Sequence, residues 1–193
     1  MDMGTKALSE GGSMENAVTR WFGAQFELLH PLLQDLHRQG GHLQGTISIE
    51  FGKGIAGWIG KRLARKLGIP IDCTDCAFEV EISHTPDFLL WLRRFSNSST
   101  MLSVFQPVGC WPDGYWIEQT GFLQLRLTVD IIEDGWYWRV LSARAGKLVF
   151  PKWLLPRSTA YKRIENGKYY FCVEFALPLL GTLVRYGGVL DVA

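Results

Sequence analysis

The chain lacks the motifs by which the common enzyme and nucleotide-binding classes are recognised. Its 193 residues contain no GxSxG, HExxH, Walker loop or GxGxxG sequence. It also lacks an excess of charge of one sign, because 20 Lys and Arg are balanced by 19 Asp and Glu to give a formal net charge of +1. No global field therefore attracts nucleic acid, and no nucleic-acid partner is expected. No uninterrupted apolar run reaches the length of about eighteen residues that a membrane-spanning helix needs.

Cysteine is scarce, with 4 residues in the whole chain, which argues against the disulfide framework of a small secreted protein. Residues 1–14 lack the charged and then apolar layout of a signal peptide. The composition, 47% hydrophobic and 20% charged, is too apolar for a disordered chain. The sequence therefore predicts a cytoplasmic protein in which residues 1–14 are a disordered leader and residues 15–193 form a single α+β domain.

Aromatic residues, in contrast, are abundant. The chain carries 8 Trp, 6 Tyr and 11 Phe. Large rigid rings of this kind fill a thick core or line an apolar ligand cavity. The aromatic content is therefore compatible with a solid core and with a ligand-binding interior.

The N-terminal region predicts two helices. Apolar residues recur at spacings of three and four between Glu15 and Gln39, which is typical of an amphipathic helix. Pro31 interrupts this pattern, because a proline disfavours helical backbone at the residue before it. We therefore expect one helix over residues 15–29 and a second over residues 31–39.

After residue 43 the pattern is mainly that of β-strands. In the clearest case, from Leu123 to Ile131, apolar residues alternate with polar ones, as in an antiparallel strand with one buried face. Similar segments predict nine or ten strands without βαβ alternation. The expected fold class is α+β, a strongly curved antiparallel β-sheet that is either open or partly closed into a barrel, with N-terminal helices and one inserted amphipathic helix. Two dipeptides, Asp134-Gly135 and Asn166-Gly167, predict tight hairpin turns.

The inserted helix spans residues 53–67 and is basic, with five Lys or Arg residues and no acidic residue. Two interpretations fit it. Either it packs its apolar stripe on the sheet, or it lies on an anionic membrane surface as a peripheral contact with Trp58 and Ile59 inserted. Its glycines are expected to act as hinges of a lid. The apolar stripe consists of Ile55, Ile59, Leu63 and Leu67.

Five blocks stand out along the chain, two of them bounded by proline: Leu29–Gln34, Gly52–Pro70, Trp91–Phe95, Pro151–Pro156 and Pro178–Gly188. Together they extend over nearly all of residues 20–190, and in them the chain resembles a bacterial family known only as a domain of unknown function. The resemblance implies a domain that occurs alone or fused to saccharopine-dehydrogenase-like NAD(P)-binding proteins and to membrane proteins. It implies no catalytic residue.

Cys73 and Cys76 have the spacing of metal ligands, but a tetrahedral zinc site needs a second pair. The chain has no second CxxC and no HxxxH sequence. We therefore expect no metal here, and we expect His30, His37 and His42 to be surface or capping residues. No cofactor and no catalytic residue are predicted.

The remaining candidates are charged residues within aromatic strands. Arg94 and Arg185 share strand parity with neighbouring leucines, which predicts that both arginines face an apolar pocket. Arg139 and Glu174 are out of phase with their apolar neighbours and are expected to point outward.

The sequence hypothesis is therefore a non-enzymatic domain that binds a hydrophobic or lipid-like small molecule. The pocket is expected beneath the helix at 53–67, with a volume of at least about 300 Å3. Arg94 and Arg185 would meet a polar head group, and the walls would include Trp91, Trp138, Phe171 and Tyr186.

Two alternatives stay open. The first is a protein-interaction or accessory domain for an NAD(P)-dependent partner, as the family resemblance implies. The second is an enzyme that uses Glu118 or Glu174 together with an arginine, because a desolvated carboxylate is able to act as an acid or a base.

Overall fold

The computed structural model describes residues 15–96, 99–151, 153 and 159–192. The N-terminal part contains α1 (Ala17–Phe22), the 3₁₀ helix η1 (Gly23–Leu28) and α2 (Pro31–Gln39), and α3 (Gly54–Leu67) is inserted after the first strand. The described strands are β1 (Gly41–Phe51), β2 (Asp75–His84), β3 (Leu89–Phe95), β4 (Thr100–Val108), β5 (Tyr115–Thr120), β6 (Leu123–Ile132), β7 (Gly135–Ala145), β8 (Leu148–Val149), β9 (Thr159–Glu165), β10 (Lys168–Leu177) and β11 (Gly181–Val192).

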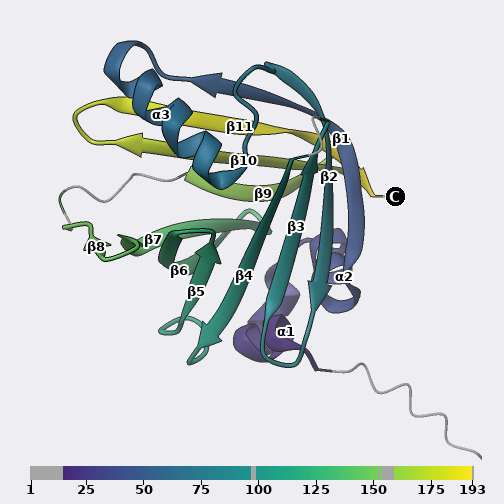
Figure 1. The fold of residues 1–193 in the computed structure, drawn as a ribbon. Coiled ribbons are helices and arrows are strands. Elements are labelled where there is room, and N and C mark those ends of the chain that lie inside the picture. The colour runs from purple at the N-terminus through teal and green to yellow at the C-terminus, as the bar shows by residue number, and fades with distance from the viewer. Residues whose placement is uncertain (1–14, 97–98, 152, 154–158, 193) are drawn as a thin grey trace, which may run out of the picture.

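The strands form one antiparallel sheet that closes into a barrel (Figure 1). Hydrogen-bonded neighbours follow the order β6-β5-β4-β3-β2-β1-β11-β10-β9-β7, and a pairing between β6 and β7 closes the ring. The short strand β8 lies outside the ring and pairs with β7. The predicted α+β class with a curved antiparallel sheet is therefore confirmed, and the sheet closes fully rather than in part.

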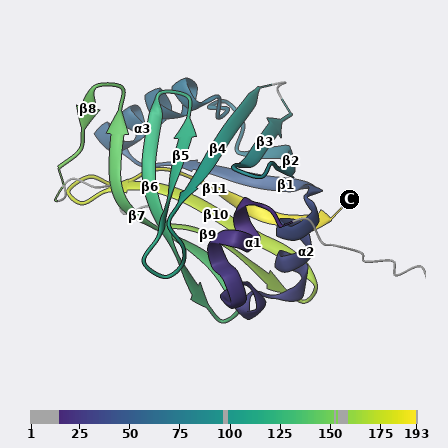
Figure 2. The same cartoon turned by 90° about the horizontal axis from the view of Figure 1, so that it is seen from below.

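The N-terminal helices pack against one end of the barrel, where Figure 2 shows α1 and α2 in front of the strands. Trp21 lies against Trp116, with ring centroids 5.4 Å apart, and Phe22 lies against Trp136 at 4.9 Å. The single helix expected over residues 15–29 is wrong in its extent. Gly23 has φ +56°, so the α-helix ends after Phe22 and a 3₁₀ helix follows.

Helix α3 lies at the opposite end and is held there by close backbone contacts. A Cβ atom on Gly52 would lie 1.9 Å from the carbonyl oxygen of Thr182, and one on Gly60 would lie 1.9 Å from that of Leu183. Both glycines are therefore required for the close approach to β11. The expected role of the glycines as hinges stays a prediction.

The buried face of α3 agrees with the expected apolar stripe at Leu63 and Leu67 but differs from it in the N-terminal half of the helix. The small residues Ala56, Gly60 and Ala64 are buried against the barrel, whereas Ile55 is 70% exposed. Trp58 is 61% exposed. The helix approaches β11 so closely that only small side chains fit between them. Ile55 and Trp58 therefore point to solvent, and Ile59 is half-buried.

The hairpin at Asn166-Gly167 is confirmed, with φ +52° and +74° at the two central residues. The other hairpin is shifted by one residue. Its central residues are Glu133 and Asp134, with φ +47° and +58°, because Gly135 already pairs with Ile132 as the first residue of β7.

Among the described residues, no helix is both long enough and apolar enough to cross a membrane. The leader expected at residues 1–14 lies outside the described residues.

Candidate functional site

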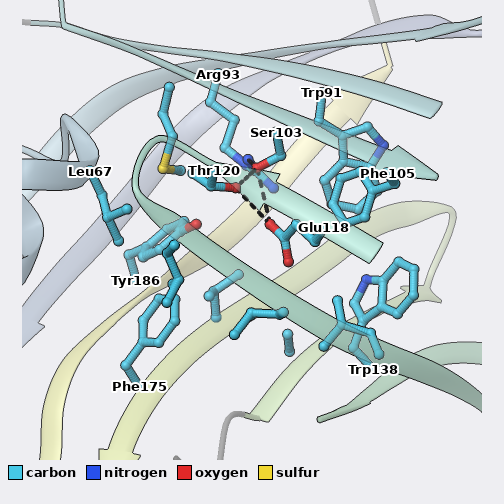
Figure 3. A pocket seen from close by; sticks show the side chains of 16 residues that line it. Leu67, Trp91, Arg93, Ser103, Phe105, Glu118, Thr120, Trp138, Phe175 and Tyr186 are labelled. Carbon is cyan, nitrogen blue, oxygen red and sulfur yellow. Dashed lines mark hydrogen bonds between the residues drawn. The ribbon is translucent and has the colours of Figure 1, made fainter. Parts of the chain in front are cut away.

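A small cavity lies inside the barrel beneath the C-terminal end of α3 (Figure 3). Its wall is mainly apolar and includes Leu67 of α3 together with Trp138, Phe175 and Tyr186 from the strands. Its place therefore agrees with the sequence expectation.

The expected size of at least about 300 Å3 is wrong. The cavity has a volume of about 50 Å3. The aromatic side chains fill most of the inner face by stacking on one another, as Phe105 and Trp138 do with ring centroids 5.4 Å apart.

Polar side chains interrupt the apolar wall at one point (Figure 3). Arg93 donates from Nη1 to Oγ of Ser103 at 2.8 Å, and Ser103 donates to Oε1 of Glu118 at 3.1 Å. Thr120 donates to the same carboxylate oxygen at 2.9 Å. Arg93, Ser103 and Thr120 are buried. We call these four residues the polar cluster, and it joins one cation to one anion through two hydroxyl groups.

The strand register explains why the polar cluster forms. Ser103 of β4 pairs with Trp91 of β3 on one side and with Thr120 of β5 on the other. Arg93 and Glu118 lie two residues along their strands from Trp91 and Thr120, and alternate residues share a face. The four side chains thus come from three adjacent strands and all point into the barrel.

A second cavity, of about 30 Å3, adjoins the first. The two cavities share Trp91, Arg93 and Trp138 in their walls, and the second extends to Lys162 of β9. Nε1 of Trp91 is buried and has no hydrogen-bond partner in the described part of the chain. Nε1 of Trp91 is therefore a hydrogen-bond donor without a partner among the described residues, on a ring whose centroid lies 5.1 Å from the guanidinium of Arg93.

Lys162 is a buried amine that no carboxylate accompanies among the described ion pairs. Its side chain is 1% exposed. Nζ lies 3.6 Å from the ring centroid of Trp136 and 4.3 Å from that of Trp91, and it forms a hydrogen bond with Nε2 of His37. Desolvation lowers the pKa of Lys162 well below its ordinary value, and the positive charge of Arg93 lowers it further.

His37 of α2 and His84 of β2 lie beside this amine. Burial lowers the pKa of His37 well below its ordinary value, with the charge of Lys162 as the second cause. The same two causes lower the pKa of His84 to about 4. Both imidazoles are therefore neutral at neutral pH. Protein atoms enclose the amine of Lys162. Its hydrogen bond to His37 therefore holds α2 against β9 of the barrel wall.

The expectation for the N-terminal histidines is correct in two of three cases. His30 caps α2 by accepting a hydrogen bond from the backbone N–H of Leu32 at 3.2 Å, and His42 is exposed. The prediction is wrong for His37, which is fully buried. A sequence signal exists on the other side of the contact, since Lys162 alternates with the apolar residues Ala160 and Ile164.

The four aromatic residues expected in the pocket wall all border the barrel interior. Trp91 and Trp138 line both cavities, Tyr186 lines the first and Phe171 lines the second. Whether they bind a ligand stays a prediction.

The two arginines expected in the pocket lie on the outside of the barrel. Arg94 forms an ion pair with Glu81 at 2.9 Å, and Arg185 is exposed and donates from Nε to Sγ of Cys172 at 3.3 Å. Their assignment to the pocket rim is therefore wrong.

Arg94 and Arg185 are expected inside because they share strand parity with leucines, but those leucines do not face the barrel interior. On β3, Leu90 and Leu92 are half-exposed, whereas Trp91 and Phe95 are buried. Parity with Trp91 identifies Arg93, not Arg94, as the inward arginine. At the start of β11, α3 buries Leu183 from outside while Val184 is also buried, so parity with Leu183 does not mark the interior.

Of the two carboxylates considered for catalysis, Glu118 borders the first cavity. Glu174 accepts a hydrogen bond from the hydroxyl of Thr182 and does not line either cavity. Arg139 also points outward, as expected, and pairs with Asp130 at 2.8 Å.

Cys73 and Cys76 are free thiols. Burial, together with the neighbouring Cys73, raises the pKa of Cys76 to about 11. Cys73 donates to the carbonyl oxygen of Asp75 at 2.9 Å. No group of three or more His, Cys, Asp or Glu residues within the described ranges is arranged to hold a metal ion.

A family model described as a domain of unknown function, DUF4166, matches residues 29–190. A comparison with curated proteins found no match. The matched range contains the polar cluster, Lys162 and both cavities. The resemblance seen in the sequence is thus supported over most of the chain, and the chain belongs to the DUF4166 family.

Proposed function

We propose that the barrel interior binds a small, mainly apolar molecule that carries one uncharged polar head group. The observation that carries this proposal is the polar cluster, a single group of hydrogen-bonding side chains in an otherwise apolar cavity. Ligand sites typically combine an apolar wall with a few polar groups that fix orientation. The head-group role predicted for Arg94 and Arg185 passes to Arg93.

The chemistry of the polar cluster favours an uncharged head group. Both hydrogen bonds found for Glu118 within the described residues use Oε1, and Figure 3 shows its other carboxylate oxygen turned toward the cavity. Arg93 supplies donors and Glu118 an acceptor, and their charges cancel. A hydroxyl or amide head group satisfies both, whereas a carboxylate would face the anion of Glu118. Nε1 of Trp91 offers one further donor.

The cavity volume of about 50 Å3 limits what binds without movement. A ligand with a lipid-length chain requires displacement of a wall element. Leu67, at the C-terminal end of α3, is the helical residue in the wall. We infer that the chain of such a ligand enters at this end of the barrel.

Arg93→Met tests the proposal against Arg94→Met, its neighbour on the outer face. Binding of a long-chain alcohol, the matching primary amide and the matching fatty acid is measured by native mass spectrometry and by displacement of a fluorescent apolar probe. We expect the alcohol and the amide to bind better than the acid. We expect Arg93→Met to weaken their binding about tenfold or more, as for a lost hydrogen bond to a charged group, while Arg94→Met binds as the wild type does. Equal binding by the two variants contradicts the proposal.

A second candidate function, an enzyme, has one observation in its favour. Glu118 lies in the cavity and is linked to Arg93 through Ser103, as an acid or base near a cation. Turnover of a bound ligand that Glu118→Gln abolishes without loss of binding would favour it. An accessory role for an NAD(P)-dependent partner, and a cytoplasmic location, stay predictions.

A further inference from the structure

The barrel end that α3 covers carries most of the exposed large hydrophobic side chains in the described part of the chain. Six of the eleven are here: Ile55 and Trp58 of α3, Leu148 and Val149 of β8, and Leu179 and Leu180 of the turn between β10 and β11. Leu179 is 85% exposed. A cluster of exposed apolar side chains of this kind marks a docking surface in a protein that is otherwise well packed.

Backbone and side-chain contacts bring these segments to the same end. The backbone N–H of Gly52, just before α3, donates to the carbonyl oxygen of Leu183 at 3.2 Å, and Leu183 lies near the start of β11. At the other end of the helix, Nζ of Lys66 lies 5.2 Å from the ring centroid of Phe122. The backbone N–H of Gly146, beside β8, donates to the carbonyl oxygen of Phe122 at 3.0 Å. Figure 1 shows α3 and the β10–β11 turn at this end, away from α1 and α2.

The charge of α3 is of one sign. Lys61, Arg62, Arg65 and Lys66 are exposed, and the helix contains no acidic residue. None of the six ion pairs between described residues uses a cation of this helix. Arg62 lies over the ring of Trp58 at 5.0 Å instead. These cations are therefore available to an anionic partner.

The apolar and basic side chains share one face of α3. Ile55, Trp58, Arg62 and Arg65 are separated by three or four residues and so lie along the side opposite Ala56, Gly60 and Ala64. Aromatic and aliphatic side chains combined with Lys and Arg match the boundary between lipid head groups and acyl chains.

We propose that the α3 end of the barrel docks on the surface of a bilayer that contains anionic lipid. Ile55, Trp58 and Leu179 insert at head-group level, and the cations of α3 lie against the lipid phosphates. A bilayer fits better than an acidic protein, because the exposed apolar residues come from three separate segments and supply insertion as well as charge. Docking does not depend on a ligand inside the barrel.

Co-sedimentation with vesicles tests this inference. The purified chain is mixed with vesicles of phosphatidylcholine alone, or of phosphatidylcholine with phosphatidylserine, at low and high salt. We expect binding to the anionic vesicles that weakens with salt, and little binding to the neutral ones. No binding to anionic vesicles, or equal binding to both kinds, overturns the inference.

Matched variants locate the contact. Replacing both Arg62 and Arg65 by Gln is expected to weaken binding roughly thirtyfold, whereas replacing both Arg126 and Arg139 by Gln, with the same loss of charge on the barrel wall, leaves it within about threefold. The pair Ile55→Ser and Trp58→Ser is expected to weaken binding about tenfold or more, against no loss for Leu102→Ser. Wild-type binding by either α3 pair overturns the inference.

One further comparison separates this inference from the proposed ligand. Arg93→Met is expected to bind anionic vesicles as the wild type does, because Arg93 is buried in the barrel. The Ile55→Ser and Trp58→Ser pair is expected to keep the affinity for a ligand supplied from solution. Failure of one activity therefore leaves the other measurable.

Discussion

Lys162 and Trp136 are direct partners in the ladder between β7 and β9, and Nζ of the lysine lies 3.6 Å from the centroid of the tryptophan ring. This ladder has only three residue pairs, the shortest within the described barrel ring. The contact packs a long side chain across it, and the hydrogen bond to His37 brings α2 to the same point. The amine therefore supports the fold at the short ladder between β7 and β9.

The pH dependence of stability provides a test of this buried amine. The folded protein holds Lys162 with a lowered pKa, so between that value and about 10.5 the unfolded chain binds a proton that the folded chain does not. Stability must then rise with pH over that interval, by up to about 1.4 kcal/mol per pH unit. Lys162→Met keeps the packing and loses this pH dependence. The free energy of unfolding of the variant therefore exceeds that of the wild type by the largest amount at the low end of the interval. Urea unfolding at a series of pH values measures it.

Two control variants accompany that measurement. Lys168→Met removes an exposed lysine that pairs with Asp191 and is expected to keep the wild-type dependence. Lys162→Ala also removes the packing on Trp136 and is expected to cost about 2–4 kcal/mol. A Lys162→Met protein with the same dependence on pH as the wild type contradicts the prediction.

The two neutral histidines predict acid sensitivity. The folded-state pKa values of His37 and His84 lie below the ordinary 6.5, that of His84 at about 4. The unfolded chain therefore gains protons first as pH falls, and stability decreases from about pH 6.5 downward. His37→Gln should reduce this loss, whereas the exposed His42→Gln should not. Thermal unfolding between neutral pH and pH 4 measures the difference, and equal curves for the two variants would count against the buried pair.

A substitution at Gly60 tests whether close packing on β11 holds α3 in place. Any side chain there would meet the backbone of Leu183, since a Cβ atom would lie 1.9 Å from its carbonyl oxygen. Gly60→Ala is expected to lower the free energy of unfolding by about 1–3 kcal/mol through overpacking. The adjacent exposed Lys61→Ala is expected to change it by less than about 0.5 kcal/mol. Wild-type stability of Gly60→Ala in urea unfolding would show that α3 is not held by this contact.

The sequence predicts the strands of the sheet better than the residues of the site. Strands follow from local patterns, whereas the face of a strand that points inward depends on the tertiary structure. Alternation in Leu123–Ile131 and the Asn166-Gly167 turn are local properties, so they fix strands and one hairpin without tertiary information. Which face of a strand is inside is a tertiary property. On β3 both alternating sets contain apolar residues, and only the barrel distinguishes Trp91, which is buried, from the half-exposed Leu92.

The same limit applies to α3 and to the interior lysine. A four-residue apolar spacing predicts a packed stripe, and Leu63 and Leu67 do pack on the core. In the N-terminal half of the helix, close approach to β11 selects the small residues Ala56 and Gly60 instead. Lys162 follows the inward parity of β9, and charged residues are almost never fully buried unless paired. A lysine at an inward position of a strand therefore indicates a buried polar contact, here the one between Lys162 and His37.

Filling the first cavity tests whether it is the ligand site. Ala160 lines both cavities, so Ala160→Leu places a larger side chain into a space of about 50 Å3. The added methyl and methylene groups gain apolar contacts, and we expect unchanged or slightly higher stability with loss of binding of the long-chain alcohol. Val173→Ala borders the same cavities and acts in the opposite direction. It enlarges the space, costs about 1–3 kcal/mol, and is expected to preserve binding or improve it for a bulkier chain. Isothermal titration calorimetry on both variants decides the matter, because binding by Ala160→Leu at wild-type affinity would place the ligand outside the barrel.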